Sequence, residues 1–177
     1  MTKATMTNAS VHASAVLVGD RAVLIRGPSG SGKSRLAFDL ILAGRSGHLP
    51  PAILVGDDRV HLDTLAGEVW VRPAAELAGL IEIRGLGIRR CDCVNEAVVG
   101  LVVDLAADDA QRLPSLEALE ISLNGVKIPR IPVGADFRPL PLVVAALTTT
   151  ESSPSGNNSA DCVKGFGNHI SPTIATE

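Results

Sequence analysis

The sequence predicts an α/β domain built on a mixed sheet with flanking helices. Three observations carry this prediction: a glycine-rich loop between an apolar run and a segment of helical periodicity, several apolar runs of strand length, and hairpin turns between some of them. Hydrophobic residues make up 46% of the 177 residues, but only three Phe, one Trp and no Tyr contribute. The core must therefore be built from Val, Leu, Ile and Ala, the usual composition of a sheet covered by helices.

The first part of the chain predicts a hairpin, the loop and a helix. Strands are expected at 15–18 and 22–25, with a turn at Gly19-Asp20. Apolar residues at helical spacing after the loop predict a helix over 33–42. The stretch "PPAILVGDD" predicts a short buried strand that ends at acidic residues.

The rest of the chain predicts further strands. The stretch "HLDTLAGEVWVRPA" predicts a hairpin that turns at Ala66-Gly67. One strand each is expected in "LIEIRGLGI", "AVVGLVVDL" and "GVKIPRIPV". The sequence has no internal repeat, which excludes a solenoid.

Both ends of the chain have the composition of disordered segments. Residues 1–10 are polar and small, and residues 149–177 are rich in Ser, Thr, Asn, Gly and Pro without periodicity, which leaves 11–148 as the expected domain. The first apolar stretch is too short for a signal peptide, and no run of about eighteen apolar residues follows it. We therefore expect a cytoplasmic protein with no membrane segment.

Charge and cysteine content argue against several functions. The 16 Lys+Arg and 19 Asp+Glu residues give a net charge of -3, without the basic excess or the aromatic platforms of nucleic-acid binding, so no nucleic-acid partner is expected. Cys91, Cys93 and Cys162 form no CxxC pair, which supports neither a disulfide framework nor a zinc site.

The stretch "GPSGSGKS" matches the phosphate-loop pattern G-x-x-x-x-G-K-[ST]. Its glycines let several backbone N–H groups converge on phosphate oxygens, and the following helix adds the positive end of its dipole. Lys33 is expected to reach the β- and γ-phosphates, and the Ser34 hydroxyl is expected to bind Mg²⁺. The expected nucleotide-binding residues are Gly27, Pro28, Ser29, Gly30, Ser31, Gly32, Lys33 and Ser34.

A phosphate loop needs an acidic partner for the magnesium ion, and the sequence offers two places for it. Asp57 and Asp58 follow "AILVG", and Asp104 follows "GLVV". The pattern slightly favours Asp104, because four apolar or small residues followed by an Asp are the usual form of the Walker-B motif, which supplies the magnesium-binding acid. Since Asp more often caps a turn or a helix, the pattern by itself leaves the choice open.

The stretch "IEIRGLGI" contains an acidic residue and a basic residue close together. On one strand, Glu82 and Arg84 share a face and lie roughly 7 Å apart. Glu82 and Arg84 could also form only a solvent-exposed ion pair without a functional role, since the sequence pattern would be the same. However, Gly85 and Gly87 break the strand where a backbone would approach a ligand. An acid and an arginine beside a glycine bend suit a metal ion and a phosphate.

In this order, "GPSGSGKS", "GDDRV" and "IEIRGLGI" resemble the catalytic domain of the HPr kinase/phosphorylase family, bacterial enzymes that act on a serine of the phosphocarrier protein HPr. The third motif is the signature of that family. His12, fifteen residues before Gly27, matches a histidine upstream of the family's loop. The resemblance covers residues 10–147 and implies a P-loop fold similar to phosphoenolpyruvate carboxykinase around the loop.

The resemblance also implies a role for each matched residue. Asp57 would accept the serine proton during phosphorylation and return it during phosphorolysis, and Asp58 would lie beside it at the metal. Glu82 would help to hold magnesium, Arg84 would orient phosphate, and His12 would lie near the phosphate site. The implied cofactors are ATP and Mg²⁺, the implied partner is an HPr-like phosphocarrier, and the implied assembly is a hexamer.

The chain departs from the family pattern at several positions. Pro28 and Arg35 stand where the family's loop has acids, and the loss of the acid at the position of Pro28 favours the kinase reaction over phosphorolysis. Arg130 and Arg138 are what remains of a basic stretch near the C-terminus. Asp104 has no matching role, so the resemblance reverses the choice that the pattern favours. The chain is expected to be a short form without the N-terminal domain of longer members.

Two other functions stay open at this point. A small-molecule kinase on a generic P-loop fold would show arginine-rich lid segments, which the sequence lacks. A nucleotide-binding regulator without turnover is the other alternative, and the presence of both Lys33 and Asp57 argues against it.

Overall fold

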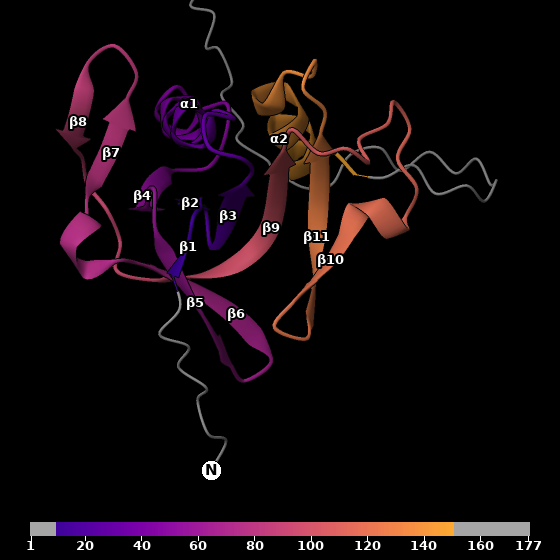
Figure 1. Cartoon of the computed structure of the whole chain (residues 1–177), viewed down its shortest axis with the longest axis horizontal. Helices are drawn as coiled ribbons and strands as arrows, with labels where there is room; N and C mark the ends of the chain where they lie inside the picture. The colour runs from indigo at the N-terminus through magenta and orange to yellow at the C-terminus, as the bar shows by residue number, and fades with distance from the viewer. Residues whose placement is uncertain (1–9, 151–177) are drawn as a thin grey trace, which may run out of the picture.

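The computed structural model describes residues 10–150, in which a nine-stranded mixed sheet carries two α-helices and a separate hairpin (Figure 1). The sheet consists of β1 Ser10–Val11, β2 Ser14–Val18, β3 Arg21–Arg26, β4 Ala52–Gly56, β5 Val60–Leu65, β6 Glu68–Pro73, β9 Ala97–Leu105, β10 Glu120–Leu123 and β11 Val126–Val133. The hairpin consists of β7 Leu80–Ile83 and β8 Gly87–Arg90. The helices are α1 Lys33–Arg45 and α2 Pro139–Thr148, with short 3-10 turns at Ala75–Leu77 and Glu117–Leu119.

Strand β3 lies near the middle of the sheet and leads into the glycine-rich loop. It is parallel to β9, and β9 is parallel to β11. Strand β2 is antiparallel to both β3 and β4, so β4 runs in the same direction as β3. The carboxyl ends of β3, β4, β9 and β11 therefore lie at one edge of the sheet, the usual place for a ligand site in such folds.

Two hydrophobic clusters cover the two faces of the sheet. Val23 and Ile25 of β3 point toward α1, and Ala22 and Leu24 point to the opposite face, as strand alternation requires. Helix α1 buries Leu36, Ala37, Leu40 and Ile41, one stripe at helical spacing, against β2, β3 and β4. Hairpin β5–β6 covers part of the other face with Leu62, Val69 and Val71. The mixed sheet with flanking helices that the sequence predicts is confirmed.

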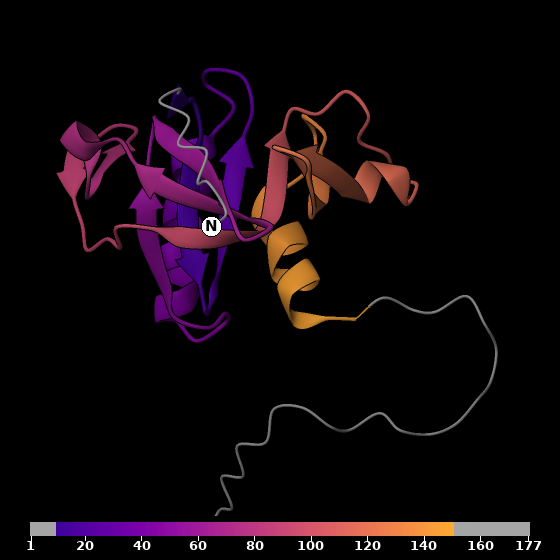
Figure 2. The ribbon, with the colours of Figure 1, turned by 90° about the horizontal axis from the view of Figure 1, so that it is seen from below.

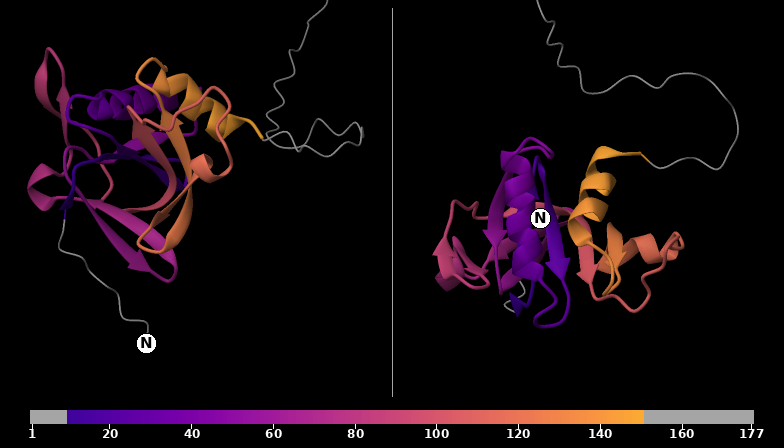
Figure 3. Two further views of the ribbon diagram at one scale, coloured as in Figure 1. Left: turned by 45° about the vertical axis from the view of Figure 1, so that its right-hand side comes forward. Right: turned by 90° about the horizontal axis from the view of Figure 1, so that it is seen from above.

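Helix α1 lies between the hairpin β7–β8 and helix α2 (Figures 1 and 3). It contacts β7 on one side and α2 on the other. Seen from below, the hairpin and the pair β10–β11 lie at opposite ends of the molecule (Figure 2). The beginning of α1 is therefore flanked by two separate walls, one from the hairpin and one from the start of α2.

The expected single strand in "LIEIRGLGI" is wrong, because this stretch is a hairpin. Strand β7 ends at Ile83, residues 84–86 form the turn, and β8 begins at Gly87. Gly85 and Gly87 have φ angles of 85° and 91°, a left-handed conformation that reverses the chain where the sequence suggested only a bend. Arg84 is thus a turn residue and does not share a strand face with Glu82.

Several other elements match or extend the expectations. The hairpins that turn at Gly19-Asp20 and Ala66-Gly67 are confirmed, and α1 continues three residues beyond the expected end, to Arg45. Strands β1 and β10 and helix α2 were not predicted. The expectations for the ends of the chain fall mainly on residues 1–9 and 151–177, outside the described residues, as does Cys162. Within 10–150, no helix is long and apolar enough to cross a membrane.

Candidate active site

The loop between β3 and α1 has the backbone of a phosphate cradle. Gly27 has a φ of 149°, and an added Cβ there would lie 2.9 Å from the carbonyl oxygen of Leu105 and 2.7 Å from Ser31 Oγ. Gly32 has a φ of 97° and directly precedes the first residue of α1. Glycine is required at both positions, at the first by close packing on β9 and at the second by the left-handed turn into the helix.

The groups in this loop are arranged to receive an anion. No side chain caps the N-terminus of α1, so the N–H groups of its first turn face the loop without a side-chain partner. Lys33, 6% exposed, folds over the loop, and its Nζ donates to the carbonyl oxygens of Gly27 and Pro28, both at 3.0 Å. The buried Ser31 hydroxyl has no hydrogen-bond partner among the described residues. These donors fit phosphate oxygens.

Asp57 connects the loop to three strands. It follows β4 and is only 3% exposed. Its Oδ1 accepts hydrogen bonds from the hydroxyls of Ser34 (2.9 Å) and Ser14 (2.5 Å), and its Oδ2 accepts one from the backbone N–H of Glu82 (3.1 Å). The Ser34 hydroxyl beside a buried carboxylate is the oxygen pair that a magnesium ion in a phosphate loop needs.

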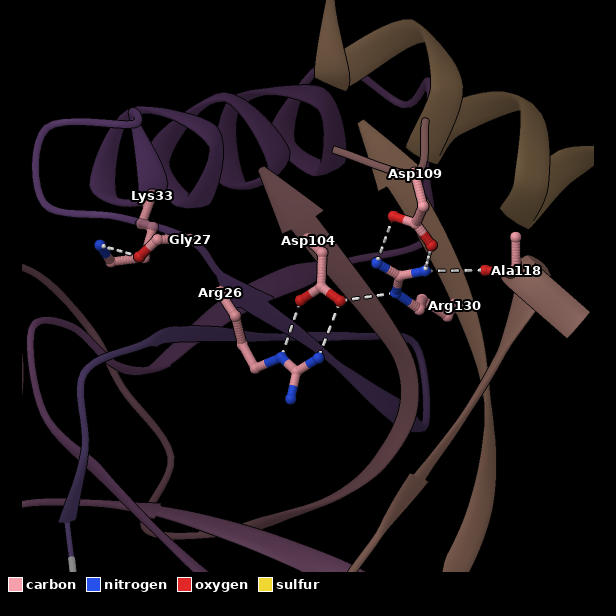
Figure 4. A network of polar contacts seen from close by, with 7 residues as sticks. All are labelled: Arg26, Gly27, Lys33, Asp104, Asp109, Ala118 and Arg130. Carbon is pink, nitrogen blue, oxygen red and sulfur yellow. Dashed lines mark hydrogen bonds and ion pairs between the residues drawn. The ribbon is translucent and has the colours of Figure 1, made fainter. Parts of the chain in front are cut away.

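Asp104, the alternative acidic partner for the magnesium ion, is hydrogen-bonded to two arginines (Figure 4). Its carboxylate accepts hydrogen bonds from Arg26 at 2.7 and 2.8 Å and from Arg130 at 2.6 Å. Arg130 also donates to Asp109 at 2.6 and 3.0 Å and to the Ala118 carbonyl at 3.1 Å. Burial by itself would raise the pKa of Asp104, but the hydrogen bonds and charges of the two arginines outweigh it, so this pKa lies below its usual value. The carboxylate that contacts Ser34 is Asp57, not Asp104.

A cavity of about 1080 Å³ opens above the loop. On the hairpin side it is lined by His12, Asp58, Glu82, Ile83 and Arg84, and on the side of α2 by Phe137, Arg138, Pro139 and Leu140. Its floor is residues 29–36 with Phe38 and Asp39. Asp57 does not line the cavity, because it is buried behind Ser34 and the hairpin backbone.

Asp58 presents its carboxylate to this cavity. Its φ of 66° is in the left-handed region, which is uncommon for a residue with a side chain and is tolerated best by Asn and Asp. The side chain is 61% exposed, and one oxygen lies 3.3 Å from His12 Nε2. The two neighbouring acids therefore have different environments, one buried and hydrogen-bonded, the other open to solvent beside a histidine.

The structure brings most of the expected site residues together. Loop residues 29–34, His12, Asp58, Glu82 and Arg84 line one cavity, and Asp57 supports it from behind. Of the two arginines kept near the C-terminus, Arg138 lines the cavity and Arg130 does not. Sequence reasoning missed Ser14 and the wall formed by the start of α2. No motif marks Ser14, but "FRPL" before an apolar run is a helix-start signal that would have located α2.

The fold and the site define a domain with a phosphate-loop motif between a strand and a helix and an open cavity beside that loop. A family model described as "HPr Serine kinase C-terminal domain" matches residues 3–164. The chain belongs to the HPr kinase C-terminal domain family.

Similar proteins agree with this membership. The chain is 36% identical over 143 residues to the HPr kinase/phosphorylase of Mycoplasma mycoides, covering 72% of this chain and 43% of that protein. It is 35% identical over 141 residues to the HPr kinase/phosphorylase of Streptococcus thermophilus, covering 69% of this chain and 41% of that protein. The chain thus spans less than half the length of these curated relatives. A solved Hpr(Ser) kinase/phosphatase from Coxiella burnetii superposes with a TM-score of 0.62 at 26% identity, over 79% of this chain and 93% of that one.

Proposed function

We propose that the protein is an ATP-dependent protein-serine kinase that acts in the cytoplasm on an HPr-like phosphocarrier. The observation that carries the proposal is the contact of Ser34 with the buried Asp57 at the base of an open cavity, because it completes a phosphate loop for a metal-nucleotide complex. The relatives named above as HPr kinase/phosphorylase suggest the partner.

The loop fits a triphosphate with magnesium. Lys33 would leave its carbonyl partners for the β- and γ-phosphates, which carry more charge. Ser34 and Asp57 would hold the magnesium ion, with Glu82 facing the same cavity. No group of three or more His, Cys, Asp or Glu side chains is placed to hold a metal within 10–150, which suits magnesium, since it is usually bound by one or two protein groups and the substrate phosphates. Bound there, magnesium would neutralise charge that develops on the phosphates.

The geometry favours an exchange of the roles that the resemblance implies for the two neighbouring acids. Asp57 accepts three hydrogen bonds and has no open path to a substrate hydroxyl, which suits a group that positions Ser34 and the metal. Asp58 faces the cavity and contacts His12, which suits the base. We therefore assign the proton transfer to Asp58 and the metal-side role to Asp57.

In the proposed reaction the serine oxygen attacks the γ-phosphorus. A new bond forms between that oxygen and phosphorus, the bond to the β-phosphate oxygen breaks, and the serine proton moves to Asp58. His12 would orient the Asp58 carboxylate, and Arg84, in the hairpin turn, would hold the transferred phosphoryl group. The wide cavity suits a protein substrate, because a serine on a protein surface must reach the phosphate loop.

Phosphorolysis is a second candidate activity, favoured by the names of the relatives. Inorganic phosphate would attack phosphoserine, pyrophosphate would leave the site, and Asp58 would return a proton to the serine oxygen. Pro28 replaces an acid of the family's loop, so we expect this reaction to be weaker than the kinase reaction.

The test incubates the protein with ATP, Mg²⁺ and an HPr-like phosphocarrier and maps the product by mass spectrometry. We expect one phosphoserine, and no product when that serine of the phosphocarrier is replaced by alanine. A protein that binds Mg-ATP but modifies none of the HPr-like proteins offered would contradict the proposal and favour a small-molecule kinase.

A further inference from the structure

Three polar or charged residues are buried in the part of the chain that the structure describes. They are Ser14, Lys33 and Asp57, with exposed fractions of 0%, 6% and 3%. The proposed function uses Lys33 and Asp57 but gives no role to Ser14. Because a hydroxyl is costly to bury unless it makes a hydrogen bond, an apolar residue is the usual choice at such a position. The buried hydroxyl of Ser14 therefore needs an explanation.

Ser14 is the first residue of β2, at the edge of the sheet that carries the phosphate loop. It pairs with Ile25, near the end of β3. Its neighbours Ala13 and Ala15 face the hydrophobic cluster under hairpin β5–β6, whereas Val16 faces the cluster under α1. Strand alternation therefore turns the Ser14 side chain toward α1.

The Ser14 hydroxyl fixes one oxygen of the Asp57 carboxylate. It donates to Asp57 Oδ1 at 2.5 Å, a length typical of a hydroxyl that donates to an ionised carboxylate. Ser34 Oγ donates to the same oxygen at 2.9 Å, and the backbone N–H of Glu82 donates to Oδ2 at 3.1 Å. An ionised carboxylate can only accept, so both hydroxyls must be donors. The Ser34 hydrogen therefore points at Asp57, which leaves the lone pairs of this hydroxyl for a metal ion.

The surroundings of Asp57 suit a cation. Within residues 10–150 its carboxylate is bonded to two hydroxyls and one backbone amide and has no ion-pair partner, whereas Asp104 is paired with Arg26 and Arg130. A buried carboxylate is normally paired with a charged side chain or bound to a metal ion. Hydrogen-bond donors behind a metal site orient its oxygens, and their loss typically costs about 10- to 100-fold in metal affinity or activity.

We propose that Ser14 is a positioning residue for the metal-nucleotide complex. Its hydroxyl keeps the Asp57 carboxylate from turning, so that Asp57 holds the Ser34 hydroxyl in the orientation that binds magnesium. His12, two residues earlier, contacts Asp58, so one short segment supports both neighbouring acids. This inference rests on the proposed function for the identity of the ligand, a nucleotide with magnesium.

The test separates the contribution of the metal from binding of the nucleotide alone. Calorimetry measures the affinity for ADP with Mg²⁺, and with EDTA in place of Mg²⁺, in the parent protein and in Ser14→Ala, which removes only the hydroxyl. We expect about tenfold weaker ADP binding with Mg²⁺ in the variant and unchanged binding with EDTA. Val16→Ala is the matched control, because Val16 is the next residue on the same face of β2 and is also 0% exposed. It should lower the stability and keep the full effect of Mg²⁺.

A second pair of variants separates the hydroxyl from the volume of the side chain. Ser14→Thr and Ser14→Val both place a β-branched side chain with two heavy atoms on Cβ, so they add similar bulk to this buried position. Thr keeps the donor and Val does not. We expect Ser14→Thr to bind ADP with Mg²⁺ about tenfold more tightly than Ser14→Val, with equal affinities in EDTA. A merely structural role for Ser14 would produce no difference that depends on Mg²⁺.

Three results would overturn the inference. Full affinity for ADP with Mg²⁺ in Ser14→Ala would mean that Asp57 needs no support from β2. Equal losses with Mg²⁺ and with EDTA in that variant would mean that Ser14 only maintains the packing of the loop. Equal affinities for ADP with Mg²⁺ in Ser14→Thr and Ser14→Val would mean that the hydroxyl has no role at the metal.

The outcome is distinguishable from failure of the proposed function. A protein that phosphorylates no HPr-like phosphocarrier, but in which Ser14→Ala weakens ADP binding only when Mg²⁺ is present, would refute the proposed function and leave the role of Ser14 standing. A parent protein that phosphorylates the phosphocarrier, together with a Ser14→Ala variant of unchanged affinity for ADP with Mg²⁺, would refute this inference alone.

Discussion

Replacing Asp104 by asparagine tests whether this residue stabilises the fold or holds the metal. Its side chain is 14% exposed and accepts three short hydrogen bonds, two from Arg26 and one from Arg130. Asparagine keeps the shape and one acceptor oxygen but removes the charge. Arg130 keeps its contacts with Asp109 and the Ala118 carbonyl in this variant. The Arg26 side chain has no other hydrogen-bond or ion-pair partner among residues 10–150, so Arg26 would lose most of its stabilising contacts.

The expected loss of stability follows from these contacts. A hydrogen bond to a charged group contributes about 1.5–3 kcal/mol, and breaking a buried ion pair by removing one partner costs about 3–5 kcal/mol. Because the Asp104 network is only partly buried, we expect Asp104→Asn to lower the free energy of unfolding by about 3 kcal/mol, or the melting temperature by about 10 °C. Asp109→Asn is the control, since Asp109 is 52% exposed and should change stability by less than about 1 kcal/mol.

The pH dependence gives this prediction a second readout. The arginines lower the pKa of Asp104 in the folded protein, so its stabilisation is fully present above the unfolded pKa of about 3.9 and is lost as the pH falls through the lower folded value. The difference in unfolding free energy between the parent protein and Asp104→Asn should therefore be constant near neutral pH and shrink below about pH 4.

The assay combines urea denaturation between pH 3 and 7 with Mg-ADP titration at pH 7. We expect a large stability difference with Mg-ADP affinity little changed, since Ser34 contacts Asp57. The reasoning is refuted if Asp104→Asn keeps its stability and loses magnesium-dependent nucleotide binding.

The remaining predictions concern the site and the thiols. Lys33→Ala should reduce phosphoryl transfer at least about 100-fold in a radiolabel assay, because Lys33 is the lysine that the loop aims at the phosphates. Asp58→Asn should reduce transfer about 100-fold with near-normal Mg-ATP binding, whereas Asp57→Asn should weaken Mg-ATP binding about tenfold or more by calorimetry. Burial, and then the neighbouring Cys93, raise the pKa of Cys91, so its alkylation by iodoacetamide at pH 8 should be slow in the folded protein and faster in urea. Light scattering should give six times the chain mass, the hexamer that the family resemblance implies.

Each of these outcomes has a clear opposite. A Lys33→Ala protein with normal transfer would remove the loop from the mechanism. An active Asp58→Asn beside an Asp57→Asn that binds Mg-ATP normally but transfers no phosphate would return the proton transfer to Asp57. Equal alkylation rates for Cys91 in the folded and unfolded protein would show that its burial has no effect on the thiolate.

The sequence by itself determined the class of fold and the chemistry of the loop. The pattern from Gly27 to Ser34 carries its own backbone geometry, because glycines at left-handed positions and a helix directly after them specify a phosphate cradle locally. The hairpins at Gly19-Asp20 and Ala66-Gly67 are local in the same way, since a short turn fixes the pairing of its two strands. The start of helix α2 is specified locally too, by a proline at the beginning of an apolar run.

The tertiary structure decided which acids serve the loop and what surrounds it. Asp57 and Asp58 follow β4, and Asp104 is the penultimate residue of β9. The residues beside them in the sequence favour Asp104 only slightly, and the structure places Asp57 at the loop instead. Strand order sets Asp57 against Ser34 and Asp104 between Arg26 and Arg130, the latter from a strand 26 residues further on. Contacts between residues far apart in the chain depend on how the strands are ordered and on the backbone φ angle of a single residue such as Asp58, and a sequence pattern specifies neither.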